Sequence, residues 1–197
     1  MGRKSKAEVR KKEILENFYE VIKVEGYENA SIAKIAERMD VNPSLLIHYF
    51  KTKEEMVVDL VDFILSRYEQ TFMNMLDDVT DAQKRFDLIT DIMYGASWFQ
   101  VSDRSVFYAC YYLATRHERI REHFKKMYDR FREFLIEELD RWKAAKIIKD
   151  VDSVMMSQYM ILMNEGHTYY EGVFRSQEEF EKRSTFVRGL VLNALQG

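Results

Sequence analysis

In this 197-residue chain, Ser31–Met56 have the sequence SIAKIAERMDVNPSLLIHYFKTKEEM. The hydroxyl of Ser31 is a suitable N-cap for a first short helix. After a turn, Asn42 is suited to cap a second one, and Pro43 fits its first position because a missing amide hydrogen costs nothing there. Thr52 then opens a capping box at the start of a longer helix. Two short helices joined by a tight turn predict a helix-turn-helix.

Helical geometry divides the side chains of the second short helix between two faces, since successive residues are about 100° apart. The inward face carries Leu46, Tyr49 and Phe50, which we expect to pack on Ile35, Ala36 and Val41. The outward face carries Ser44 and His48, flanked by Leu45 and Ile47. This mixed polar and apolar face is suited to a DNA groove, and a packed surface helix is the alternative.

Helical periodicity continues through the rest of the chain. One helix precedes the stretch and ends at Gly26, which is suited to close it in the left-handed conformation. The expected later helices span residues 53–76, 81–96, 104–114, 118–145, 152–171 and 177–195. A single proline and seven glycines argue against an all-β or α/β fold. We expect an all-α protein, with an N-terminal three-helix helix-turn-helix DNA-binding domain at 1–56 and a C-terminal helical ligand-binding and dimerisation domain at 57–197.

Composition indicates a cytoplasmic protein. Cys110 is the only cysteine and cannot form an intramolecular disulfide, and no secretory leader or membrane-spanning segment is recognisable. The net charge is only −3, yet residues 3–12 contain six basic side chains and one acidic one. Arg3, Lys4 and Lys6 are therefore candidates for a disordered arm that contacts DNA, and a solvated terminus is the alternative.

The stretch Ser31–Met56 resembles the DNA-binding segment of TetR/AcrR-type regulators. The resemblance covers about residues 10–60 and is carried by Ile35-Ala36, Val41, His48-Tyr49-Phe50 and Lys53-Glu54-Glu55. It implies a homodimer with a three-helix reading head and a variable ligand-binding domain. It also implies, as a rule, repression that an effector relieves.

The same resemblance assigns candidate contacts to double-stranded DNA. They fall on Ser31, Pro43, Ser44, Leu45, Ile47, His48, Tyr49 and Lys53. The family pattern usually has glycine at Asp40, a polar or basic residue at Pro43, a small or hydroxylated residue at Leu45 and an aromatic residue at Ile47. Asp40 is still able to adopt a left-handed turn. We hypothesise that Leu45 and Ile47 contact thymine methyl groups, whereas His48, Tyr49 and Lys53 contact the backbone.

The second part of the chain is rich in tyrosine and methionine, which suits a pocket for a bulky, mostly apolar small molecule. The candidate lining residues are Trp98, Tyr108, Tyr112, Tyr159 and Met163. A role in the core is the alternative for each of them. Asn164, Glu165 and His167 lie on the same predicted helix as Tyr159, where a polar group would orient the ligand.

The resemblance implies that the last two helices pair with their copies in a second chain, as a four-helix bundle. The candidate interface residues on one helical face are Phe180, Val187, Leu190, Val191 and Ala194. Gly166 and Gly172 would permit close approach. Packing within one chain is the alternative, and the two roles are compatible.

An enzyme is not expected. The four histidines, the single cysteine and the lack of a glycine-rich phosphate loop form no recognisable catalytic or metal-binding pattern, and no cofactor is expected. The expected partners are double-stranded DNA, a second copy and a small-molecule effector, with no membrane. A helical interaction protein without DNA and a regulator without a small-molecule effector are the competing interpretations.

Overall fold

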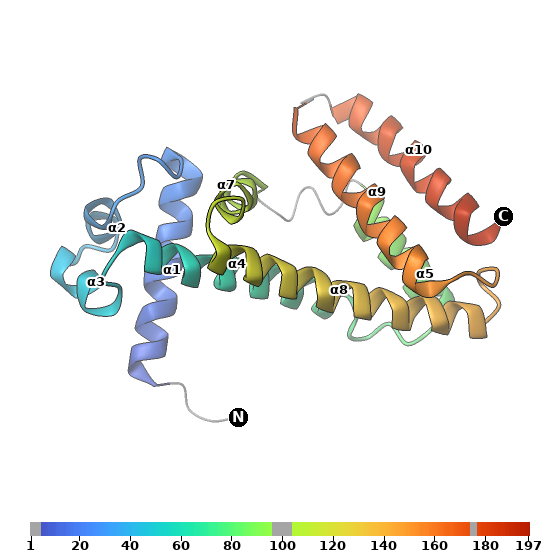
Figure 1. The fold of residues 1–197 in the computed structure, drawn as a ribbon, viewed down its shortest axis with the longest axis horizontal. Coiled ribbons are helices and arrows are strands. Elements are labelled where there is room, and N and C mark those ends of the chain that lie inside the picture. The colour runs from blue at the N-terminus through green and yellow to red at the C-terminus, as the bar shows by residue number, and fades with distance from the viewer. Residues whose placement is uncertain (1–4, 96–103, 174–176) are drawn as a thin grey trace. The chain divides into compact units, whose positions relative to one another are not determined.

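The computed structural model describes residues 5–95, 104–173 and 177–197, and within these ranges every regular element is an α-helix (Figure 1). The helices are α1 (Lys6–Glu25), α2 (Ile32–Arg38), α3 (Pro43–Tyr49), α4 (Lys53–Leu76), α5 (Ala82–Tyr94), α7 (Arg104–Ala114), α8 (Glu118–Ala144), α9 (Ser153–Val173) and α10 (Gln177–Gln196). The expected all-α architecture is confirmed. No helix in the described ranges combines the length and apolar character that a bilayer crossing requires.

The chain forms two compact units, which differ from the two segments expected from the sequence. Unit 1 comprises residues 1–70 and 103–125, and unit 2 comprises residues 71–102 and 126–197. Two of the three boundaries between the units therefore fall inside helices, namely α4 and α8. A functional division after residue 56 stays a prediction.

The first helix of unit 1 has defined ends. The Ser5 hydroxyl accepts a hydrogen bond from the Glu8 amide at 3.2 Å, and the Glu8 carboxylate accepts one from the Ser5 amide at 2.7 Å. Lys6 is the first residue of α1 and is therefore not part of a disordered arm. Gly26 ends α1 with φ 81° and ψ 158°, so the expected closure by glycine uses an extended, glycine-specific conformation and not the left-handed helical one.

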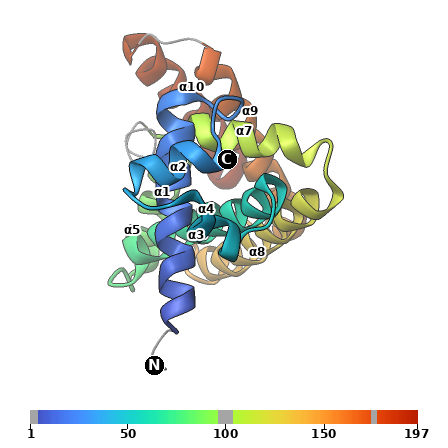
Figure 2. The same ribbon diagram turned by 90° about the vertical axis from the view of Figure 1, so that its left-hand side faces the viewer.

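The core of unit 1 is formed by side chains of α1, α2, α3 and α4. Helix α2 packs on α1 and α3, and α1 also packs on α7. In Figure 2 the helices α1, α2 and α3 lie toward the viewer. The core side chains include Ile14, Phe18, Ile35, Leu46, Phe50, Met56 and Leu60, each at most 1% exposed. Burying these apolar groups stabilises the arrangement that positions α3.

In unit 2, helices α5, α9 and α10 pack against one another. Trp142 of α8 is fully buried and meets Phe86 edge to face, with their ring centroids 5.0 Å apart. The buried Tyr94 hydroxyl donates a hydrogen bond of 2.7 Å to the Met160 carbonyl, which links α5 to α9. Burial raises the pKa of Tyr94, so this hydroxyl keeps its proton and remains a donor at neutral pH.

A buried ion pair joins three segments of unit 2. The Arg85 guanidinium donates to the Glu138 carboxylate at 2.7 Å, and Glu138 is only 2% exposed. Arg85 also donates to the carbonyls of Leu76 and Val79, each at 3.0 Å. One side chain of α5 therefore pairs a buried charge on α8 and satisfies carbonyls at the end of α4.

Replacing Arg85 with alanine should lower the free energy of unfolding by about 3 kcal/mol, because the buried Glu138 charge would lose its closest partner and keep only Arg141, which lies 3.4 Å away. The double substitution Arg85→Met with Glu138→Leu should recover most of that loss. Urea denaturation measures both. Lys182→Ala, at an exposed ion pair with Glu178, is the control and should cost at most about 1 kcal/mol. An equally small loss for Arg85→Ala would contradict the role of the buried pair.

Candidate nucleic-acid interface

The turn between α2 and α3 has a defined backbone geometry. The Val41 amide donates to the Ala36 carbonyl at 3.0 Å, and the Asp40 amide donates to the Glu37 carbonyl at 3.1 Å. These two hydrogen bonds form a Schellman motif at the end of α2. Asp40 has φ 53°, so the expected left-handed turn at this non-glycine residue is confirmed.

Capping and burial then orient α3. The Asn42 side-chain oxygen accepts a hydrogen bond from the Ser44 amide at 2.9 Å, and Pro43 occupies the first turn, as expected. Leu46 is 0% exposed and Phe50 is 1% exposed. Since these two side chains lie four residues apart on one face, their burial requires the opposite face of α3 to point outward.

Most of the candidate contact residues of α3 are accessible. Pro43, Ser44, Ile47 and His48 are exposed, and Ile47 is 51% exposed despite its apolar side chain. Leu45 and Tyr49 are half-buried at the flanks of this face. The rings of His48 and Tyr49 meet edge to face at 5.2 Å, which restrains both of them.

The two candidate contacts outside α3 also have structural roles within unit 1. The Ser31 hydroxyl accepts a hydrogen bond from the Lys34 amide at 3.3 Å and caps α2, as expected. The Lys53 ammonium donates to the Tyr27 carbonyl at 2.9 Å and lies 4.3 Å from the centre of the Tyr27 ring. Burial lowers the pKa of Lys53, and the nearby Glu28 and Glu54 oppose that shift. Lys53 thus joins the start of α4 to the α1–α2 loop, and its phosphate contact stays a prediction.

The basic side chains near the N-terminus are partly paired. Arg10, Lys11 and Lys12 form ion pairs with Glu13, Asp59 and Glu16 at 2.7, 3.4 and 3.5 Å. Arg3 and Lys4 lie outside the described residues.

Lys51 was not identified from the sequence. It is exposed in the junction after α3, and its ammonium has no hydrogen bond or ion pair among the described residues. The sequence signal for this contact was the position of a basic residue two places after Tyr49, at the end of the helix expected to contact DNA. Lys51 is therefore an additional candidate for a phosphate contact.

The candidate ligand-lining residues lie in different units. Tyr108 and Tyr112 belong to α7 in unit 1, whereas Tyr159 and Met163 belong to α9 in unit 2. Tyr159 and Met163 are half-buried against the core of unit 2. Tyr112 is 50% exposed. Trp98 lies outside the described residues, so a common pocket for these five residues stays a prediction.

Two polar residues suggested to orient a ligand have partners within unit 2. Asn164 donates to the Met93 carbonyl, and the buried His167 ring nitrogen lies 3.0 Å from the Ser184 hydroxyl. The His167 ring also stacks on Phe180, with their centroids 5.6 Å apart. Both residues therefore connect helices of unit 2, and Glu165 is half-buried on α9.

The candidate interface residues on α10 differ in exposure. Phe180 and Val191 are 6% and 0% exposed within unit 2 itself, whereas Val187 and Ala194 are half-buried and Leu190 is 39% exposed. Other apolar side chains of α9 and α10, which were not identified from the sequence, are more exposed. They are Leu162, Tyr169, Val173 and Phe186, at 71%, 70%, 68% and 65%.

These side chains define two exposed apolar stripes. On α9, Leu162, Tyr169 and Val173 share one helical face with Gly166. On α10, Phe186 and Leu190 lie four residues apart. A Cβ atom at Gly166 would meet nothing within 4 Å, so the backbone of α9 is open to close approach there.

Two family models match the chain. The model described as "Bacterial regulatory proteins, tetR family" matches residues 14–60. The model described as "Tetracyclin repressor-like, C-terminal domain" matches residues 81–196, which is more than half of the chain. No functionally curated protein matches it.

Solved structures of regulators share the fold. A TetR transcription regulator from Haloarcula marismortui has a TM-score of 0.83 at 19% identity, covering 96% of this chain and 100% of that one. A transcriptional regulator from Saccharomonospora viridis in complex with choline has a TM-score of 0.82 at 14% identity, covering 95% and 98%. FadR from Bacillus subtilis in complex with stearoyl-CoA has a TM-score of 0.67 at 16% identity, covering 91% and 96%. At these identities the likeness concerns the fold.

Replacing Asp40 with valine should lower the free energy of unfolding by about 1 to 2 kcal/mol, because a β-branched side chain is unfavourable at positive φ. Asp40→Asn is the matched control and should change it by less than about 0.5 kcal/mol, because asparagine tolerates this conformation. Urea denaturation distinguishes the two variants. Equal stability of Asp40→Val and Asp40→Asn would show that the turn does not depend on this backbone conformation.

Proposed function

The chain belongs to the TetR family of transcriptional regulators, and we propose that it acts as a homodimeric repressor that a bulky, mostly apolar small molecule releases from its operator. The observation that carries the proposal is the exposed face of α3, where Ile47 is 51% exposed above the buried Leu46 and Phe50. A short helix held in this way is suited to enter the major groove.

On DNA, the side chains of α3 would divide into two classes of contact. Leu45 and Ile47 offer hydrocarbon, which discriminates thymine methyl groups from other base edges. Ser44, His48 and Tyr49 offer polar atoms to phosphates or base edges, and Pro43 sets the start of the helix. Lys51 and Lys53 follow α3 in the chain and supply positive charge for phosphates, which favours binding without reading the sequence.

A second copy of the chain would bind through α9 and α10. Large apolar side chains that are 65% to 71% exposed, such as Phe186 and Leu162, favour burial against a partner. The open backbone at Gly166 permits helices to approach closely. Two reading heads about 34 to 36 Å apart would then contact successive major grooves of a palindromic operator.

Release by an effector follows from linkage. A ligand that binds the DNA-free conformation more tightly than the DNA-bound one lowers DNA affinity, and DNA lowers ligand affinity by the same factor. Two solved regulators of similar fold are in complex with choline and with stearoyl-CoA, which supports a small-molecule effector here. A regulator without an effector is the alternative. Native mass spectrometry of protein purified from its own host distinguishes them, because a retained ligand adds its mass to the dimer.

Replacing Ile47 with alanine should weaken binding to the duplex upstream of the protein's own gene by about 10-fold, because apolar contact with the bases is lost. Binding to random duplex should not change. Electrophoretic mobility-shift titrations at several salt concentrations measure both.

Lys51→Ala is the matched control for Ile47→Ala. It should weaken binding to both duplexes alike and reduce the salt slope by about 1, since it removes a phosphate contact. The proposed base contact would be refuted if Ile47→Ala bound every duplex as the parent does.

The double substitution Leu162→Glu with Phe186→Glu should convert the dimer into a folded monomer, because one charge would be placed on each apolar stripe. Light scattering coupled to size exclusion measures the mass, and circular dichroism checks the helix content. Val24→Glu is the control, since Val24 is 75% exposed on α1. A dimer that persists in the double variant would disprove this interface.

A further inference from the structure

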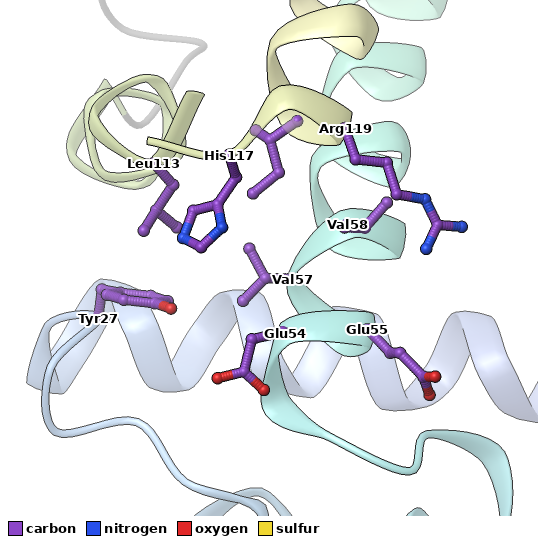
Figure 3. A pocket seen from close by; sticks show the side chains of 9 residues that line it. Tyr27, Glu54, Glu55, Val57, Val58, Leu113, His117 and Arg119 are labelled. Carbon is purple, nitrogen blue, oxygen red and sulfur yellow. The ribbon is translucent and has the colours of Figure 1, made fainter. Parts of the chain in front are cut away.

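A cavity of about 210 Å³ lies wholly within unit 1 (Figure 3). Three segments contribute its walls, namely the α1–α2 loop, the first two turns of α4, and the end of α7 with the start of α8. The lining residues are Tyr27, Glu54, Glu55, Val57, Val58, Leu113, His117, Arg119 and Ile120. The candidate ligand-lining residues of the sequence analysis are not among them, so this is a separate site.

The inner wall of the cavity is apolar. Val57 is 2% exposed, Ile120 is 3% exposed and Leu113 is 6% exposed, so these side chains are anchored in the core of unit 1. The His117 ring projects from the α7–α8 turn toward Val57 (Figure 3). A ligand that entered here would bury hydrocarbon against rigid side chains, which is favourable.

The polar rim of the cavity carries charges of both signs. Glu54, Glu55 and Arg119 are among the lining residues, and the Lys53 ammonium lies beside the rim, 4.3 Å from the centre of the Tyr27 ring. The guanidinium of Arg119 extends away from His117 (Figure 3). The Glu55 carboxylate is engaged, because it accepts a hydrogen bond from the Lys51 amide at 3.0 Å. Among the described residues, the Glu54 carboxylate accepts no hydrogen bond and forms no direct ion pair, although its charge acts on the neighbouring Lys53 ammonium. Glu54 is therefore available to a ligand.

Glu54 also lies near an aromatic ring. Tyr27 and Glu54 line the same side of the cavity (Figure 3), and burial and then the Glu54 charge raise the pKa of the Tyr27 hydroxyl. The Tyr27 ring itself already contacts the Lys53 ammonium. A carboxylate at the mouth of an apolar cavity is suited to an ammonium group.

We propose that this cavity binds a small organic cation, an amine attached to a compact apolar body. The ammonium group binds the Glu54 carboxylate, and the apolar body packs on Val57, Leu113 and Ile120. The volume is below the roughly 300 to 1,000 Å³ of pockets for drug-sized ligands, so the apolar body is about the size of a single aromatic ring. The site adjoins Lys53 and Tyr27, whose contact holds the start of α4.

Three ligands that share a phenylethyl group test the charge preference. Phenethylamine, 2-phenylethanol and 3-phenylpropanoate are titrated calorimetrically into the full chain at neutral pH, without DNA. Phenethylamine should bind at least about 10-fold more tightly than the alcohol, since a charge-assisted hydrogen bond is gained. The propanoate should bind most weakly. Equal affinities, or no binding of the amine at millimolar concentration, would overturn the proposal.

Two substitutions locate the site. Glu54→Gln should reduce the preference for phenethylamine over 2-phenylethanol from about 10-fold to near parity, because the shape is kept and the charge is lost. Glu122→Gln, at an exposed acid on α8 outside the cavity, should retain the preference. Retention of the preference in Glu54→Gln would place the amine elsewhere and contradict this assignment. Circular dichroism confirms that both variants are folded.

Discussion

The burial of Leu46 and Phe50 determines which face of α3 is exposed. Their side chains are at most 1% exposed, so a rotation of α3 would expose them to water and cost apolar burial. The left-handed turn at Asp40 and the Asn42 cap determine where α3 begins. Together, packing and backbone geometry leave Ile47 and His48 exposed, although isoleucine would otherwise favour the interior.

Much of this local structure could be predicted from the sequence because caps and periodicity act over a few residues. Ser31 and Asn42 cap the helices expected of them, and the predicted bounds of α4, 53–76, are those found. Contacts between distant residues were not predictable in this way. Lys53 binds the carbonyl of Tyr27, 26 residues away, and Arg85 binds Glu138, 53 residues away. A single sequence contains no local signal for such pairs.

Periodicity also does not distinguish an intramolecular core from an intermolecular interface. Phe180 and Val191 follow the helical pattern expected of an interface, yet both are buried within unit 2. The more exposed side chains, such as Leu162 and Tyr169, lie on a helix whose apolar residues are distributed around much of its surface. Likewise, the cavity beside Glu54 depends on residues from three separate segments, and it becomes apparent only when they are folded together.

A methyl NMR titration of the protein with the duplex upstream of its own gene tests directly whether the exposed face of α3 contacts DNA. The methyl signals of Leu45 and Ile47 should shift or broaden strongly at low salt. The signals of the buried Leu46 and Ile35 should change little, because packing shields them from the bases. If Leu45 and Ile47 remained unchanged while the protein was folded, or if the changes lay outside α3, the proposed DNA-binding face would be wrong.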